Sequence, residues 1–156
     1  REVYKMKMRQ GGFLISKTHQ LSGRLFSKKL KDYNIEEINH AQGRILFFLW
    51  QNDGISIQEL SEMTSLGKST LTSMLDRLED SGYLKRVPCS EDRRKTLIHV
   101  TDKDCHIKTA YEKIVSEMSQ IFYQGFTDDE IDQFEKYLKR VFENLLRIEK
   151  NSIKNI

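Results

Sequence analysis

Apolar residues recur at helical spacing in the first third of the chain. Over residues 12–31 most of them fall three or four positions apart, with lysines between them. A second stretch begins after Asn39, whose side chain is suited to cap a helix while Gln42 reaches back to it, and it stops at residues 52–54, Asn-Asp-Gly. The pattern therefore predicts two amphipathic helices in this part of the chain.

Two shorter helical patterns follow and meet at Gly67. Ser56 and Glu59 have the capping-box spacing that opens the first of them. The second covers residues 68–81, and Gly82 is the natural residue to end it. Since successive residues of a helix are about 100° apart, this helix buries one apolar face and leaves the opposite face free. The residues away from its apolar face are Ser69, Thr72, Ser73, Asp76 and Arg77.

Strand patterns at residues 83–87 and 96–100 come next, joined by a polar loop. Helix, turn, helix, strand, loop and strand is the order of a winged helix-turn-helix, in which one helix enters a DNA groove and the loop, or wing, reaches beside it. Small hydroxyl side chains let such a helix approach the groove floor and bond base edges or phosphates. We therefore expect the chain to bind duplex DNA, although Ser and Thr are also ordinary residues of a solvated helix face.

Positive charge gathers in the predicted wing. The net charge of the whole chain is +3, which is too small to indicate a nucleic-acid partner by itself. Within the wing, however, five cations are opposed only by Glu91 and Asp92. This local excess favours contacts with phosphate, and a protein-interaction module whose basic wing is merely solvated is the alternative from another class. The five cations are Lys85, Arg86, Arg93, Arg94 and Lys95.

The last third of the chain predicts two long helices with narrow apolar stripes. The first stripe runs from Ile107 to Ile121 with spacings of 4, 3, 4 and 3 residues, and the second runs from Ile131 to Ile148 with spacings of 3, 4, 3, 4 and 3. The chain has too little further sequence to cover both stripes. We therefore expect a homodimer, with packing back on the first helix within one subunit as the alternative.

Composition argues against several other classes. The chain has 156 residues, a length typical of one domain, with 38% hydrophobic and 31% charged residues. It contains no apolar run of the ~18 residues that a membrane span needs, so we expect no membrane partner. Gly-rich phosphate loops, nucleophile elbows and paired-acid patterns are missing from the sequence, and its four histidines lack metal-ligand spacing. We therefore expect neither an enzyme nor a bound cofactor or metal.

The chain has two cysteines, Cys89 and Cys105. Together with a start that has no signal-peptide pattern, they suit a reducing cytoplasm, and we expect a cytoplasmic protein. Cys89 begins the wing loop and Cys105 begins the next helix, so both are expected where an oxidant can reach them. Two ordinary thiols are the simpler interpretation, and a redox-responsive regulator that uses Cys89 or Cys105 stays open as an alternative.

Three motifs carry a family resemblance. Residues 92–94, Asp-Arg-Arg, with Val100 and Thr101 after them, resemble the Asp-x-Arg wing and the Leu-Thr strand end of the MarR (multiple-antibiotic-resistance regulator) family, with Val in place of Leu. Residues 39–46 resemble the entry to that family's second helix, and residues 78–84 resemble the end of its recognition helix. The motifs are weak singly but occur in the right order and spacing.

The resemblance implies a mainly α fold with a small β-hairpin wing, that is, a winged helix-turn-helix with flanking dimerisation helices. It implies one domain over residues 1–156, with the DNA-binding region at 39–101 and the dimerisation helices at 1–33 and 102–156. It also implies a homodimeric transcriptional regulator, and specifically a ligand-responsive repressor that binds a palindromic operator.

Carried onto this sequence, the resemblance assigns most of the DNA contacts to the second helix of the winged region and to the wing. Lys68 and the hydroxyl residues after it would face the major groove, with Arg77 near the backbone. Arg94 would enter the minor groove at the wing tip, with Asp92 orienting it. The full predicted set is Lys68, Ser69, Thr70, Thr72, Ser73, Arg77, Arg86, Asp92, Arg93, Arg94 and Lys95.

The resemblance also implies an effector site. Members of the family often bind small phenolic or aromatic acids in a crevice between the dimer helices and the DNA-binding region. Members that sense peroxides have a Cys in the first helix, and this chain has none there, so peroxide sensing by that route is not expected. The alternative for the aromatic residues is that they belong to the core. The candidate lining residues are His19, Arg44, Phe47, Trp50 and Tyr111.

Overall fold

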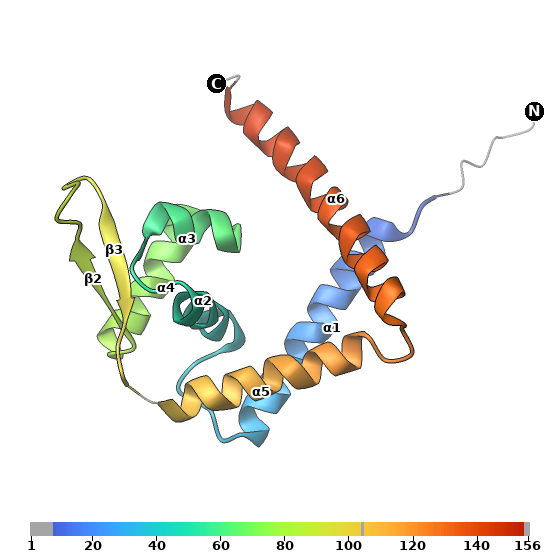
Figure 1. The fold of residues 1–156 in the computed structure, drawn as a ribbon, viewed down its shortest axis with the longest axis horizontal. Helices are drawn as coiled ribbons and strands as arrows, with labels where there is room; N and C mark the ends of the chain where they lie inside the picture. Colours follow the sequence, from blue (N-terminus) through green and yellow to red (C-terminus); the bar gives the residue numbers. More distant parts are fainter. Residues whose placement is uncertain (1–7, 104, 155–156) are drawn as a thin grey trace, which may run out of the picture. The chain divides into compact units, whose positions relative to one another are not determined.

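The computed structural model describes residues 8–103 and 105–154. The chain divides into two compact units, residues 1–116 and 117–156, and each is described by itself. Figure 1 shows the fold, which is mainly α with a small antiparallel sheet, as the sequence predicted. The elements are α1 (Gly11–Asp32), α2 (His40–Gln51), β1 (Ile55–Ser56), α3 (Ile57–Thr64), α4 (Lys68–Asp80), β2 (Leu84–Pro88), β3 (Thr96–Val100), α5 (Cys105–Phe122) and α6 (Asp128–Lys154).

Local caps set the ends of the helices in the first unit. The Asn39 side chain accepts a hydrogen bond from the Gln42 backbone N–H at 2.8 Å, and the Gln42 side chain accepts one from the Asn39 N–H at 3.0 Å. Ser56 and Glu59 form the same reciprocal pair at the start of α3. After α4, Gly82 has a φ of +83°, a left-handed conformation that costs glycine little. These caps confirm the helix boundaries that the sequence predicted.

The sheet has one strand more than the predicted hairpin. Its order is β1-β3-β2, and all pairs are antiparallel, with Ile55 of β1 opposite Ile98 of β3. Asp53, just before β1, also contacts β3, because its carboxylate accepts a hydrogen bond of 2.8 Å from the Val100 N–H. In this order β2 is an edge strand. The expectation of a hairpin alone was incomplete because a strand of two residues is too short to show alternation in the sequence.

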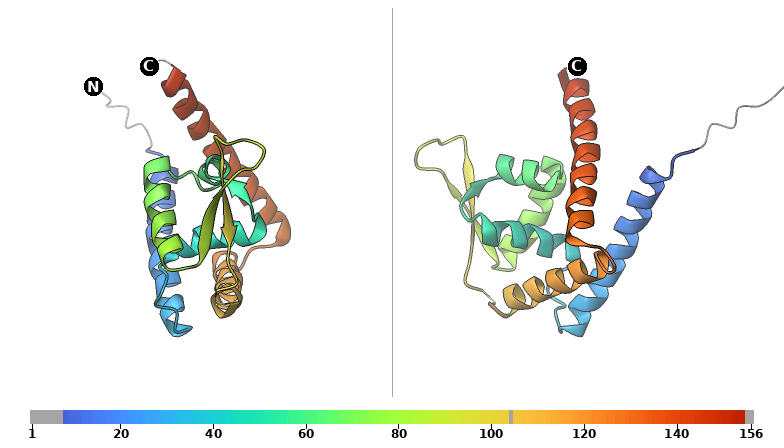
Figure 2. Two further views of the ribbon diagram at one scale, coloured as in Figure 1. Left: turned by 90° about the vertical axis from the view of Figure 1, so that its left-hand side faces the viewer. Right: turned by 45° about the vertical axis from the view of Figure 1, so that its right-hand side comes forward.

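The core of the first unit lies between the helices and the sheet. Apolar residues from α2, α3, α4 and β3 are fully buried together, and helix α4 lies beside the edge strand β2 (Figure 2). The fully buried aliphatic residues of α2, α3, α4 and β3 are Ile45, Leu46, Leu49, Leu60, Leu71, Leu75, Leu78 and Ile98.

The part of the chain that the structure describes contains no helix long and apolar enough to span a membrane.

Helices α2 and α5 approach closely at Gly43. A Cβ atom at position 43 would stand 2.3 Å from Cε2 of Tyr111, well inside van der Waals contact. The Tyr111 ring is buried, with ring centroids at 5.0 Å to Phe26, 5.7 Å to Phe47 and 6.0 Å to Trp50. Because aromatic rings surround Tyr111, the side chain has little room to move away from a larger residue at position 43.

Gly43→Ala is therefore expected to lower the free energy of unfolding by about 1–2 kcal/mol. Overpacking lowers the stability by about 1–3 kcal/mol, and the higher helix propensity of Ala offsets up to ~1 kcal/mol of this loss. Chemical denaturation measures the difference. Gly23→Ala in α1 is the matched control, because a Cβ there meets nothing within 4 Å, and it should be neutral or stabilising. A Gly43→Ala protein as stable as the parent would contradict the packing described.

The second unit carries an exposed apolar stripe on α6. Thr127 caps the helix by accepting a hydrogen bond of 3.2 Å from the Glu130 N–H, and the Glu130 carboxylate accepts from the Thr127 hydroxyl. Near the start of α6, the Tyr123 hydroxyl donates to the Glu135 carboxylate at 2.6 Å, and this bond raises the pKa of Tyr123 to about 12. The exposed stripe consists of Phe134, Tyr137, Leu138, Val141, Phe142, Leu145 and Ile148.

Candidate nucleic-acid interface

Helix α4 presents an exposed polar face. Its buried side is formed by Leu71, Leu75 and Leu78, which anchor the helix in the core. The serine and threonine side chains on the other side are short, so the helix surface there is low and rich in hydrogen-bonding groups. Since all of the predicted contact residues of α4 are exposed, the helix leaves this face open to a groove. They are Lys68, Ser69, Thr70, Thr72, Ser73 and Arg77.

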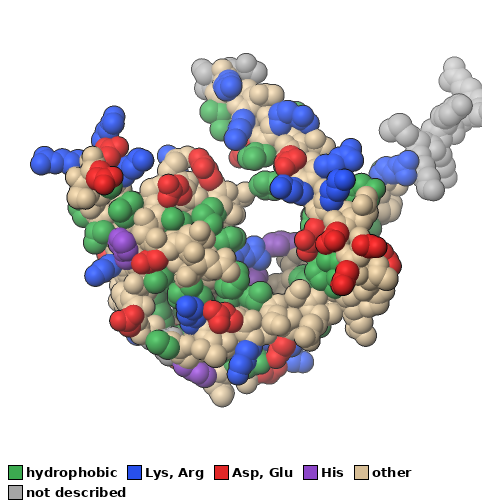
Figure 3. All heavy atoms as spheres, viewed as in Figure 1, with side chains coloured by type: hydrophobic (Ala, Val, Ile, Leu, Met, Phe, Trp, Pro, Cys, Tyr) green, Lys and Arg blue, Asp and Glu red, His purple; other side chains and the backbone are tan. Residues whose placement is uncertain are grey.

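The wing ends in a cluster of cations. The loop between β2 and β3 is closed by a backbone hydrogen bond of 2.9 Å from the Cys89 N–H to the Lys95 carbonyl. Figure 3 shows Lys and Arg side chains projecting around this end of the hairpin. All three members of the wing-tip cluster, defined as Arg93, Arg94 and Lys95, are exposed. Such a cluster suits contact with phosphate or with the negative potential of a groove.

Asp92 holds Arg94 at the wing tip. One carboxylate oxygen of Asp92 accepts from the Arg94 backbone N–H at 3.0 Å and lies 3.3 Å from Nε of the same residue. The Arg94 side chain is nevertheless 91% exposed. Asp92 therefore orients the side chain through the backbone and Nε, while most of the side chain stays exposed. The family resemblance implied this orientation, and entry of Arg94 into the minor groove stays a prediction.

Arg86 lies apart from these cations. Its Nη2 is 2.6 Å from an Asp76 carboxylate oxygen and its Nε is 2.5 Å from Glu79, so it is bound to two acids of α4. The hydrogen bond with Glu79 raises the pKa of Arg86, and the bond with Asp76 adds to the effect. Lys85, beside it on β2, is exposed. A DNA contact by Arg86 stays a prediction, and the structure gives this residue other partners.

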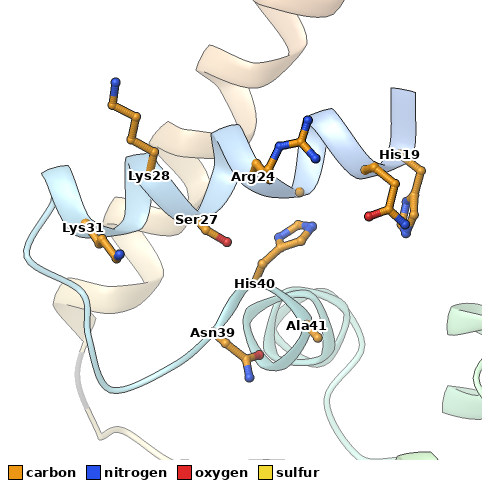
Figure 4. A pocket seen from close by; sticks show the side chains of 10 residues that line it. His19, Arg24, Ser27, Lys28, Lys31, Asn39, His40 and Ala41 are labelled. Atoms are coloured by element: carbon orange, nitrogen blue, oxygen red, sulfur yellow. The ribbon is translucent and has the colours of Figure 1, made fainter. Parts of the chain in front are cut away.

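A basic pocket lies between α1 and the start of α2. It has a volume of about 550 Å³, and Figure 4 shows side chains of both helices around it. Its cations Arg24, Lys28 and Lys31 are spaced four and three residues apart, so they follow one side of α1. The described lining residues include no Asp or Glu. The full lining is His19, Gln20, Gly23, Arg24, Ser27, Lys28, Lys31, Asn39, His40 and Ala41.

The predicted effector residues are distributed differently. Of them, His19 lines the α1–α2 pocket, and Arg44 is exposed and touches the pocket residue His40. The other two aromatic candidates, Phe47 and Trp50, instead pack their rings against the third, the buried Tyr111, which agrees with the core interpretation that the sequence left open. Sequence reasoning missed the basic side of the pocket, although the i, i+4, i+7 spacing of its cations along α1 was a usable signal.

His40 is held as a neutral ring in this pocket. Arg44 Nη2 lies 3.1 Å from His40 Nε2, and since a guanidinium only donates, Nε2 accepts and Nδ1 carries the proton. Nδ1 is buried and has no hydrogen-bond partner among the residues that the structure describes. Burial, followed by the positive charges of Arg44 and His19, lowers the pKa of His40 from 6.5 to about 4. Protonation would place a charge in a site that disfavours it.

Acid should therefore destabilise the protein through His40. Because the folded pKa lies below the unfolded one, the stabilisation is complete above pH 6.5 and is lost as the pH falls toward 4. The loss is at most about 3 kcal/mol, and about 1 kcal/mol once partial exposure is considered. Thermal unfolding at pH 7.5 and 5.0 measures it. His40→Gln should reduce the loss of stability between pH 7.5 and pH 5.0. The control His106→Gln, at an exposed position, should show the same loss as the parent. A loss in His40→Gln as large as that of the parent would refute the assignment.

The remaining candidates do not assemble into a further site. Cys89 is half-buried at the base of the wing loop and Cys105 is exposed at the start of α5, and both are free thiols. Within residues 8–103 and 105–154, no group of three or more His, Cys, Asp or Glu side chains is arranged to hold a metal ion. The redox alternative stays untested.

Comparison with known proteins gives consistent matches. A sequence model of the MarR family matches residues 38–96. The regulator TtmR of Methylorubrum extorquens is 36% identical over 72 residues, which cover 46% of this chain and 37% of TtmR, so the match spans less than half of that protein. The multiple antibiotic resistance protein MarR of Escherichia coli is 29% identical over 131 residues, covering 83% of this chain and 89% of that protein.

Solved structures agree with the sequence matches. A mutant of E. coli MarR in complex with operator DNA has a TM-score of 0.72 at 29% identity and covers 83% of this chain and 91% of its own. A MarR transcriptional regulator from Methanosarcina mazei has a TM-score of 0.73 at 29% identity, with coverages of 88% and 96%. The winged helix-turn-helix, the Asp-Arg-Arg wing and these matches lead to one conclusion: residues 38–96 match the MarR family, and the described fold is similar to that of solved MarR regulators.

Proposed function

We propose that the protein is a transcriptional repressor that binds a palindromic site in duplex DNA as a homodimer. The observation that carries the proposal is the exposed polar face of α4 in the same compact unit as the wing-tip cluster. A helix of this kind fits the major groove, and an arginine on an adjacent hairpin reaches the minor groove. The similarity to E. coli MarR, whose structure was solved with operator DNA, supports the proposal.

The base contacts come from the hydroxyl residues of α4. Thr72 and Ser73 lie in the exposed middle of that face, where short side chains can reach base edges. The wing-tip cluster supplies phosphate and minor-groove contacts, which raise affinity with little base discrimination. Affinity and sequence preference are thus assigned to different elements, which makes them separable by mutation.

A second copy of the chain covers the apolar stripe of α6. Five of the stripe residues follow the heptad spacing of four and three positions, and all of the stripe remains exposed, with Leu145 at 66%. The five are Phe134, Leu138, Val141, Leu145 and Ile148. An isolated helix with such a face is a poor surface for a monomer, because large exposed apolar patches promote association. Dimerisation also places two recognition helices for two half-sites, about 34 Å apart along DNA.

The α1–α2 pocket is the proposed site for an anionic effector. Arg24, Lys28 and Lys31 supply the positive charge that would attract a carboxylate. An effector can change DNA binding only through its difference in affinity between two arrangements of the dimer, and a hundredfold ratio corresponds to roughly 2.7 kcal/mol. Titration of benzoate and related aromatic acids into the protein–operator complex tests this part, with Arg24→Gln and Lys28→Gln together as the variant that should no longer respond.

The decisive experiment for DNA binding is selection from a pool of random duplexes. We expect enrichment of a palindrome whose affinity falls steeply as salt rises. Thr72→Ala and Ser73→Ala should change which palindrome is enriched, because they alter the face that reads bases. If no duplex is enriched and random DNA is not bound at low salt, the protein is not a DNA-binding regulator and the protein-interaction alternative gains support.

A further inference from the structure

Arg86 joins the recognition helix to the wing. It lies on β2, and the acids that bind it, Asp76 and Glu79, are three residues apart on α4, so both carboxylates are on one side of that helix. The guanidinium offers Nη2 to Asp76 and Nε to Glu79 at 2.6 and 2.5 Å. Two charge-assisted hydrogen bonds from one planar group fix an orientation as well as a distance.

Glu79 also bonds to the open edge of the sheet. Because β2 is an edge strand, the backbone N–H groups on its outer side have no neighbouring strand to bond. Glu79 uses its second oxygen to accept from the Arg86 backbone N–H at 3.4 Å. Glu79 therefore contacts both the backbone and the side chain of Arg86, which ties α4 to the wing at one point of β2.

The partners also balance charge on the DNA-facing side. Asp76 lies away from the apolar face of α4, next to Arg77, where an unbalanced carboxylate would repel phosphate. Arg86 neutralises the Asp76 charge from strand β2. With its side chain 24% exposed and its guanidinium bound to both acids, Arg86 is poorly placed to serve as a phosphate contact as well.

We propose that Arg86 is a positioning residue, which holds the wing at a fixed place against the recognition helix and does not itself contact DNA. This differs from the role that the sequence suggested for it. The wing must reach the minor groove while α4 occupies the adjacent major groove, so their relative placement determines whether both contacts form together. A wing released from α4 would have to be ordered again on binding, which costs affinity.

Amide hydrogen exchange of the free protein tests the structural part of the proposal and needs no DNA. Arg86→Gln should increase the exchange rate of residues 84–100 by about tenfold or more, while α2 stays protected. Arg77→Gln is the matched control: it removes the same charge from an exposed position of α4, and it should leave the exchange of the wing unchanged. Since this measurement is made without DNA, it can fail independently of the proposed function.

Salt dependence on a random-sequence duplex separates positioning from direct contact. Each phosphate contact adds about 0.9 to the slope of log affinity against log salt. Arg77→Gln should lower the slope by about 1.8, or 0.9 for each subunit of the dimer, and Arg86→Gln should leave it unchanged. Asp76→Asn combined with Glu79→Gln keeps Arg86 but removes its partners, and it should loosen residues 84–100 as Arg86→Gln does. The proposal would be overturned by normal exchange of the wing in both Arg86→Gln and the Asp76→Asn, Glu79→Gln protein, or by a slope reduced by about 1.8 in Arg86→Gln.

Discussion

Leu145→Glu is expected to convert the proposed dimer into a monomer. Leu145 lies in the C-terminal half of the exposed stripe of α6, and a second copy that covers the stripe would bury the new carboxylate. An unpaired charge in an apolar interface costs several kcal/mol, and a twofold-symmetric dimer contains two of them. We expect the dimer dissociation constant to rise by about a thousandfold or more, which corresponds to roughly 4 kcal/mol.

Sedimentation at about 1–100 μM protein measures this change, with Lys136→Gln as the control. That substitution also lowers the net charge by one, but position 136 lies on the opposite side of α6 from the stripe. It should leave the dimer intact. Leu145→Glu should keep the helical content of the parent and bind a palindromic duplex weakly, because the two half-sites are then occupied independently. A dimer of unchanged affinity in Leu145→Glu would show that this stripe is covered in another way.

Local chemistry explains why much of the fold was predictable from the sequence. The capping residues Asn39 and Ser56 bond to groups only three positions away, and Gly82 adopts a conformation that few other residues tolerate. Such signals depend on the nearest residues alone, so the sequence contains them completely. The exposed face of α4 was predictable for the same reason, since helical spacing decides which side chains share a face.

Long-range contacts explain what the sequence did not reveal. Strand β1 forms because Ile55 pairs with Ile98, which lies 43 positions later in the chain. A strand of two residues is too short to give a periodic pattern in the sequence. Arg86 was expected at the DNA, since a cation in a basic wing resembles its neighbours until its acidic partners on α4 are known. The sequence also makes the ring of Tyr111 a candidate wall of an effector site, and its burial against three other aromatic rings becomes visible only in the structure.

Arg94→Ala is expected to weaken binding of the selected palindrome by about a hundredfold at physiological salt. A hydrogen bond to a charged group contributes about 1.5–3 kcal/mol, and the proposed dimer has two wings, so even the lower figure gives a factor of this size. The fold should be unaffected, because the side chain is 91% exposed and contacts Asp92 at the surface. The preferred sequence should change little, since the minor groove presents a degenerate pattern of donors and acceptors.

Fluorescence anisotropy over a range of salt concentrations measures both the affinity and the number of ions released. The slope of log affinity against log salt should fall by about 1.8, or 0.9 for each wing, if Arg94 neutralises one phosphate on each side. Lys113→Ala is the control, because it removes the same charge from an exposed position of α5 and should reduce affinity only slightly through the general field. Arg94→Lys separates charge from shape: it should recover part of the slope but not the full affinity, because an ammonium group lacks the planar donors of a guanidinium. An Arg94→Ala protein that binds like the parent would refute the role of the wing, and the base-reading face of α4 would then have to account for the affinity alone.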